Sequence, residues 1–208
     1  MIELPDARES LEGFHPIFIE GYQVAWANWR RFMSLEGNTD LAAPLSSTSR
    51  ANFIHDHVCI EFEKRIAGLE GVESTTKALD FYALRIGNGI LLRFKYTPNG
   101  APRNVRTERQ KRLARQTFTS DEITALTGGA ALIKPTLLTV GYTVDGDEIS
   151  RIEIRRDCKN HLPWSYDIFG GDAVMEPLVL DGLADETKPA VVASARKKAA
   201  EHEDAAQG

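Results

Sequence analysis

Hydrophobic residues recur with helical spacing in two segments of the first third of the chain. In residues 15–35 they occur every three or four positions, at Phe18, Tyr22, Ala25, Trp29 and Phe32. In residues 50–70 they occur at Ile54, Val58, Phe62, Ile66 and Leu69. A spacing near 3.6 residues places such side chains on one face of an α-helix. The pattern therefore predicts two amphipathic helices, the second capped by one of Ser47, Thr48 and Ser49.

From residue 79 the hydrophobic period changes to two, which is typical of β-strands. One apolar face continues across the loop at 87–89, which places Ile86, Leu84 and Tyr82 opposite Ile90, Leu92 and Phe94. Residues 137–144 and 148–156 predict a second hairpin, in which Val140 and Tyr142 lie opposite Ile154 and Ile152. The other face of each hairpin is mixed, so one covering layer of helices is expected.

Between the hairpins, Thr107 with Gln110 and Thr119 with Glu122 have the spacing of helix capping boxes. The first predicts a short basic helix that ends near residue 116. The sequence thus predicts an α+β fold, with two N-terminal amphipathic helices packed on a mostly antiparallel four-stranded sheet of two hairpins, and the short basic helix between them. Residues 1–180 form the expected single domain. Residues 181–208 are charged and rich in alanine, which predicts a flexible tail.

Composition adds the class of protein and its compartment. The chain has 208 residues, of which 42% are hydrophobic and 26% charged, as in ordinary globular domains. Its longest apolar runs are far shorter than the ~18 residues of a membrane span. The acidic start of the chain lacks the basic and apolar regions of a secretory signal. With only Cys59 and Cys158 as cysteines, these features predict a cytoplasmic protein with reduced thiols.

Positive charge is concentrated in one segment. Residues 85–116 contain nine basic residues and one acid, whereas the rest of the chain contains 16 basic and 29 acidic residues. A cationic segment in an anionic protein indicates a negatively charged partner, either an acidic protein or a nucleic acid. A solvated surface whose charges pair with one another is the alternative. The predicted patch joins the short helix to the second face of the sheet and consists of Arg85, Arg93, Lys95, Arg106, Arg109, Lys111, Arg112, Arg115, Arg151 and Arg155.

A metal-dependent nuclease is the second interpretation. A helix, a strand with an acid, a strand with a lysine and a basic helix follow one another in restriction-endonuclease-like folds, which here suggests Glu61 or Glu63, then Asp80, then Lys95. Such sites need two carboxylates to hold the divalent ion. Arg93 stands where the second acid is expected, so binding is favoured over catalysis.

A transition-metal site is a weaker hypothesis. The possible ligands lie on the second predicted helix and near the end of the sheet, at His55, His57, Cys59, Glu61, Cys158 and His161. No HExxH motif or pair of CxxC motifs accompanies them, and structural zinc sites normally show four closely spaced ligands. We therefore expect no metal, no cofactor and no catalytic residue.

The segments LRIGNGILLRFKY, RNVRTERQ and GYTVD resemble a family of uncharacterised bacterial proteins, over residues 50–168. Some of these resemble members of regulatory or defence-type gene pairs. The resemblance implies a partner-binding protein and supplies no catalytic residue. Together, the sequence favours a non-catalytic partner-binding or regulatory protein without membrane contact. A nuclease, or its degenerate relative, is the alternative.

Overall fold

The computed structural model describes residues 2–35, 46–75, 81–87, 89–98, 107–127, 134–157 and 163–170. The chain divides into two units, Met1–Leu178 and Val179–Gly208, and all described residues belong to the first. The predicted tail at 181–208 lies outside the described residues. Across the described part of the chain, no helix combines the length and apolar character needed to cross a membrane.

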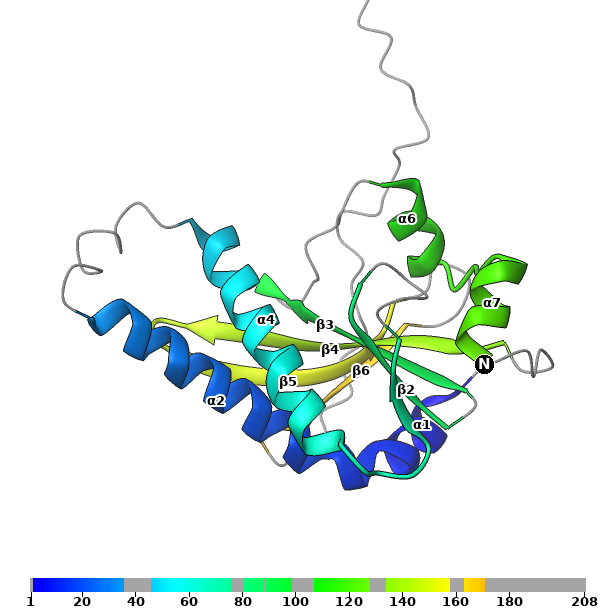
Figure 1. The fold of residues 1–208 in the computed structure, drawn as a ribbon, viewed down its shortest axis with the longest axis horizontal. Helices are drawn as coiled ribbons and strands as arrows, with labels where there is room; N and C mark the ends of the chain where they lie inside the picture. The colour runs from blue at the N-terminus through cyan, green and yellow to red at the C-terminus, as the bar shows by residue number, and fades with distance from the viewer. Residues whose placement is uncertain are drawn as a thin grey trace, which may run out of the picture. The chain divides into compact units, whose positions relative to one another are not determined.

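The helices and strands alternate in blocks along the chain (Figure 1). The helical elements are α1 (Leu4–Leu11), the 3-10 turn η1 (Glu12–Phe14), α2 (His15–Ser34), α4 (Ser47–Ile66), α6 (Glu108–Ala114) and α7 (Ser120–Thr127). The strands are β1 (Val72–Ser74), β2 (Ala83–Ile86), β3 (Ile90–Tyr96), β4 (Thr136–Asp145), β5 (Glu148–Arg156) and β6 (Trp164–Asp167). The two predicted amphipathic helices are α2 and α4. Ser46 caps α4, one residue before the predicted candidates, and accepts a hydrogen bond from the Ser49 amide at 3.1 Å.

The strands form one sheet in the order β1-β2-β3-β4-β5-β6. All neighbouring pairs are antiparallel except β3 and β4, which are parallel. The α+β class is confirmed, but the prediction of four strands is wrong, because β1 and β6 extend the sheet at its two edges. Each is at most four residues long, too short for a period of two to be recognised. The predicted pairings Leu84 with Leu92 and Val140 with Ile154 are confirmed.

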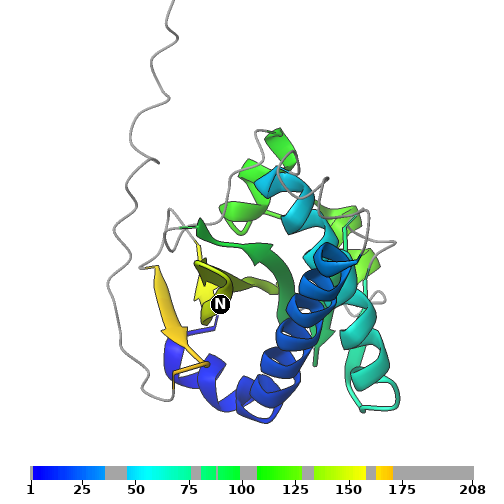
Figure 2. The same cartoon turned by 90° about the vertical axis from the view of Figure 1, so that its left-hand side faces the viewer.

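The main core lies between the sheet and the helix pair α2 and α4, which run side by side over one face (Figure 2). Phe62 contacts the rings of Phe18 and Phe94 at centroid distances of 5.6 and 4.5 Å. The Tyr22 hydroxyl donates a hydrogen bond to the Val140 carbonyl at 2.8 Å, which satisfies a polar group inside this core. Aromatic rings thus join both helices to the central strands.

A second, smaller core lies on the opposite face of the sheet, under α6 and α7. Its buried members are Ala83, Leu91, Leu113, Phe118, Leu126 and Leu137. The Gln116 side chain joins this layer to β4 with two hydrogen bonds of 2.7 Å to the backbone of Leu137. The expectation of a single covering layer is therefore wrong: the connection from β3 to β4 places helices on the second face as well.

Candidate functional site

The basic helix α6 begins at the predicted cap. The Thr107 hydroxyl accepts a hydrogen bond from the Gln110 amide at 3.3 Å. The second predicted box is also confirmed, since Thr119 and Glu122 exchange reciprocal hydrogen bonds between side chain and backbone at 2.9 and 3.2 Å. Because both helices are short, these caps supply much of the hydrogen bonding at their first turns. They also set the position of Glu122 relative to α6.

Glu122 holds two arginines of α6 in place. One carboxylate oxygen, Oε1, lies 3.2 Å from Arg109 Nε and 2.8 Å from Arg112 Nη2. Burial alone raises the pKa of Glu122, but the Thr119 hydrogen bonds and the charge of Arg112 leave it below its ordinary value. The carboxylate is therefore ionised at neutral pH. One negative charge thus fixes two cations, which leaves this group positive overall.

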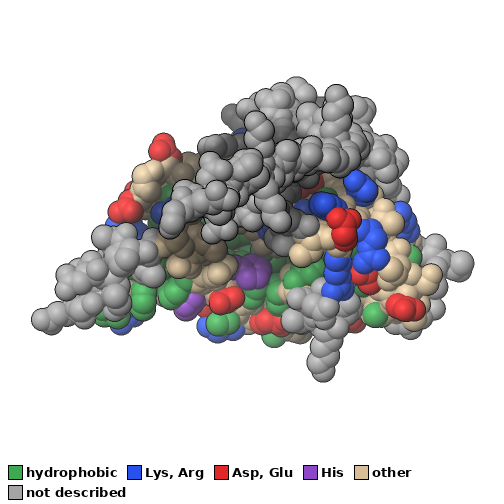
Figure 3. All heavy atoms as spheres, turned by 90° about the horizontal axis from the view of Figure 1, so that it is seen from above, with side chains coloured by type: hydrophobic (Ala, Val, Ile, Leu, Met, Phe, Trp, Pro, Cys, Tyr) green, Lys and Arg blue, Asp and Glu red, His purple; other side chains and the backbone are tan. Residues whose placement is uncertain are grey.

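The cations of α6 are accessible to a partner. Lys111 and Arg115 are exposed, and the side chains of Arg109 and Arg112 are about one third exposed. Lys111 forms an ion pair of 2.9 Å with Glu108 on the surface, where such pairs contribute little. Figure 3 shows Lys and Arg side chains gathered around acidic ones toward the right of the view, the side on which α6 lies. The structure thus supports an exposed cationic cluster on α6, comprising Arg109, Lys111, Arg112 and Arg115.

The sheet arginines occupy a different environment. Arg93 and Arg155 are only 6% and 2% exposed, so they do not lie on the surface, where the sequence pattern placed them. At these residues the mixed face of β3 and β5 is turned toward the protein interior. A charged group buried there requires a partner. Arg151 is also partly buried, and its guanidinium lies 3.7 Å from carboxylate oxygens of Glu153 and Asp167. These three arginines belong to an internal polar network and not to one surface with α6.

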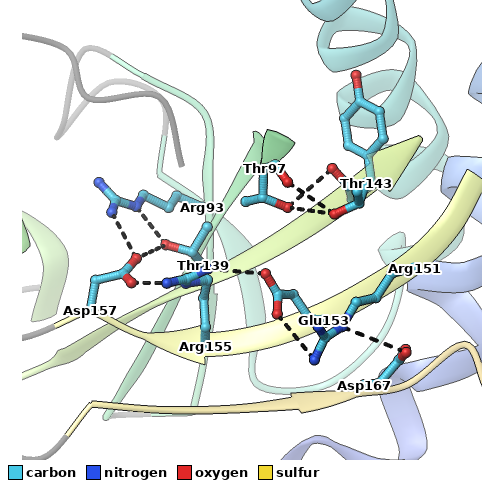
Figure 4. A network of polar contacts seen from close by, with 10 residues as sticks. Arg93, Thr97, Thr139, Thr143, Arg151, Glu153, Arg155, Asp157 and Asp167 are labelled. Atoms are coloured by element: carbon cyan, nitrogen blue, oxygen red, sulfur yellow. Dashed lines mark hydrogen bonds and ion pairs between the residues drawn. The ribbon is translucent and has the colours of Figure 1, made fainter. Parts of the chain in front are cut away.

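Carboxylates and hydroxyls of neighbouring strands complete this network (Figure 4). Arg155 donates to Asp157 Oδ1 at 2.8 Å and to Glu153 Oε1 at 3.0 Å. Arg93 donates from Nε to Thr139 Oγ1 at 2.8 Å, and its Nη2 lies 3.7 Å from Asp157 Oδ2. Register explains the arrangement, because Arg93, Thr139 and Arg155 lie side by side on β3, β4 and β5. Burial raises the pKa of Glu153, while the charges of Arg155 and Arg151 oppose the rise.

The remaining residues of the predicted patch are dispersed. Arg85 pairs with Glu73 of β1 at 2.6 Å and donates to the Gly87 carbonyl at 2.9 Å, at the end of the first hairpin. Lys95 is partly buried beside the internal network. Arg106 lies outside the described residues. The ten predicted residues therefore separate into the α6 cluster, the internal network and isolated positions.

No group of three or more His, Cys, Asp and Glu residues in the described ranges has the arrangement of a metal site. His55 Nε2 lies 3.7 Å from Cys59 Sγ, a contact between two residues of one helix. Burial raises the pKa of Cys59 to about 12, which disfavours the thiolate that binds metals. Glu61 pairs with Lys64 and Arg65 of its own helix. The other proposed ligands Asp80, Cys158 and His161 lie outside the described residues.

Sequence reasoning overlooked the acidic partners. Asp157, Glu153 and Glu122 pair with the arginines, and of these three acids the sequence pattern singles out only Glu122, as part of a capping box. A signal was present in β5 and after it, where Glu153, Arg155 and Asp157 alternate and must therefore share one face of the sheet. Like Arg151, they belong to the face opposite Ile152 and Ile154.

No protein-family model matches the chain, and neither a curated protein nor a solved structure is significantly similar to it. The fold and the cluster define an α+β protein with a six-stranded open sheet and an exposed cationic helix.

Proposed function

We propose that this is a cytoplasmic, non-catalytic partner-binding protein whose α6 cluster binds an acidic segment of another protein. The observation that carries the proposal is the pairing of Arg109 and Arg112 with Glu122. Cations that are already oriented lose less side-chain entropy when a ligand binds. Lys111 and Arg115 add two exposed charges beside them. A regulatory role, as one member of a bacterial gene pair, is consistent with this kind of site.

The size of the cluster favours a short acidic segment over a nucleic acid. At 1.5 Å per residue, the seven residues of α6 span about 10 Å. Duplex DNA carries a charge about every 1.7 Å, and its affinity depends on the number of phosphates that are neutralised. Because Arg93 and Arg155 are buried, they do not extend the cluster along the sheet. A long polyanion would pass beyond α6 and meet a protein that is otherwise acidic.

Fluorescence anisotropy with a labelled poly-glutamate peptide and labelled duplex DNA tests the proposal at low salt. The informative variant is K111E/R115E, which reverses two exposed charges of α6. The matched control is R30E/R31E, because Arg30 and Arg31 are exposed neighbours on α2 and the change in net charge is identical. We expect peptide affinity to fall about tenfold in the α6 variant, which corresponds to ~1.4 kcal/mol, and to change little in the control.

Equal losses in both variants would show that only net charge matters, and the α6 proposal would be wrong. Tighter binding of DNA than of peptide, lost in K111E/R115E, would favour the nucleic-acid interpretation. Cleavage of DNA or RNA that requires Mg²⁺ or Mn²⁺ would support the alternative of a nuclease. If wild-type protein binds neither probe at low salt, the α6 cluster is only a solvated surface.

A further inference from the structure

Lys95 and Arg93 occupy neighbouring positions on the second face of β3. They are two residues apart on one strand, so their side chains leave the sheet on the same side. Arg93 is almost fully buried, whereas Lys95 is partly exposed and so opens this part of the face to solvent. Arg93 Nη1 also reaches Gln110 Oε1 of α6 at 3.4 Å. The pair therefore lies between the internal network and α6.

The carboxylates of the network are committed mainly to a different arginine. The short contacts of Asp157 and Glu153, at 2.8 and 3.0 Å, are both made by Arg155. Arg93 reaches Asp157 only at 3.7 Å. Asp167 and the second oxygen of Glu153 lie beside Arg151. Among the described residues, the Arg93 end of the network therefore has only the 3.7 Å contact with Asp157 as a negative charge.

Lys95 adds to this imbalance. Among the described residues its ammonium group, which carries three donors, makes neither a hydrogen bond nor an ion pair. A half-buried charge without a partner is unfavourable, so an added anion would relieve the cost at Lys95. It would also add negative charge beside Arg93, whose ion pair with Asp157 is long at 3.7 Å. The Thr139 hydroxyl, held between Arg93 Nε and Asp157, keeps the guanidinium in a fixed plane.

We propose that Lys95 and Arg93 form a binding site for a single oxyanion group, a carboxylate or a phosphate of a small ligand. The lysine supplies the accessible charge and the arginine supplies a fixed, buried one. Planar guanidinium and mobile ammonium groups are the two usual binders of such anions. This site is independent of the proposed function, because it uses no residue of the α6 cluster.

The charges that face Lys95 determine how such a site depends on pH. Burial, together with the neighbouring Arg93, lowers the pKa of Lys95 to about 8, and Asp157 opposes this shift. His55 of α4 is the other titratable neighbour, and burial lowers its pKa, so it is neutral above pH 7. Bound anion favours the protonated lysine. Affinity should therefore be high at pH 7 and fall as pH rises through 8.

Isothermal titration calorimetry on the full chain, with sulfate and separately with succinate, provides the test. Both probes keep a constant charge between pH 7 and 9, and sodium chloride at equal ionic strength serves as the control for screening. Sulfate stands in for a phosphate group and succinate for a carboxylate. We expect affinity to fall roughly tenfold from pH 7 to pH 9, as the protonated fraction of Lys95 falls. The variant K95M should lose binding at every pH, whereas K111M should bind as wild type does.

Each outcome of these titrations either supports or overturns the proposed anion site. Preference for sulfate would identify a phosphate ligand, and preference for succinate a carboxylate ligand. Binding in K95M equal to that of wild type, or no binding of either probe to the wild type at pH 7, would overturn the proposal. Because K95M replaces a charge by an apolar chain of similar length, its fold should persist, and circular dichroism verifies this. As a second measurement, an NMR titration of the Lys95 ammonium should show its pKa rise when sulfate is added.

Discussion

Neutralising Asp157 tests whether the internal network stabilises the fold. Asp157 is the shared counter-charge of two buried arginines, at 2.8 Å from Arg155 and 3.7 Å from Arg93, and it accepts a hydrogen bond from Thr139 at 3.5 Å. Removing one partner of a buried pair costs about 3–5 kcal/mol, because the other charge is left uncompensated. Asparagine keeps one oxygen for Arg155, and the Asp157 side chain is 13% exposed. We therefore expect D157N to lower the free energy of unfolding by about 2–3 kcal/mol.

Urea unfolding at pH 7 measures this loss, provided that the slope of the transition is unchanged. The matched control is E73Q, which neutralises the carboxylate of the Arg85 pair. Glu73 is 65% exposed, so its loss should cost at most about 1 kcal/mol. Equal losses in D157N and E73Q would refute the argument that burial makes the network energetically important.

Two further predictions concern the helical layer. In G21A the new methyl group would lie 2.2 Å from a Phe62 ring carbon. Thermal unfolding should therefore show that the free energy of unfolding falls by about 1–3 kcal/mol. The control G13A adds its methyl group in open space and should be neutral or slightly stabilising. Burial lowers the pKa of His55, so the folded state favours the neutral imidazole. The contribution of His55 to the free energy of unfolding is therefore complete above the unfolded pKa of 6.5, and it is lost as the pH falls below that value. Stability of H55Q should depend less on pH between 7 and 5 than that of wild type, and equal slopes in urea titrations would contradict this.

The parts of the fold that periodicity predicts are long elements with one apolar face. Such a face is present in α2, α4 and both central hairpins, and the register Leu84 with Leu92 follows from keeping that face continuous. The strand β6 has only four residues, so its alternation of Trp164 and Tyr166 with polar residues is too short to identify a strand, although both aromatic side chains pack into the core. The helix α1 was overlooked because its polar, acidic sequence buries only Ala7 and Leu11.

The sequence predicts which residues of the candidate site are charged, but it does not predict which of them are exposed to solvent. A count of charges identifies the segment 85–116, and capping boxes locate α6 correctly. Neither says whether an arginine on a mixed strand face is solvated. That depends on whether another layer covers the face, and the layer here comes from the connection between β3 and β4. Arg93 was therefore assigned to the surface, although it lies beneath its neighbours.

The second face of the sheet changes from apolar to charged along β3. Leu91 joins the apolar cluster beneath α6 and α7, whereas Arg93 and Lys95, further along the same strand, enter the polar network. The alternation that gives β3 one apolar face also places consecutive cations side by side on the other. Acids on β5 and just after it compensate the arginines by register, but β4 contributes Gly141 opposite Lys95 and therefore no carboxylate. The Cβ position of Gly141 is filled by the Thr97 side chain, 2.6 Å away, so an acid could not replace it without moving Thr97. Among the described residues, the surplus of positive charge at Lys95 is thus a consequence of strand packing, and the anion that we propose to bind there would balance it.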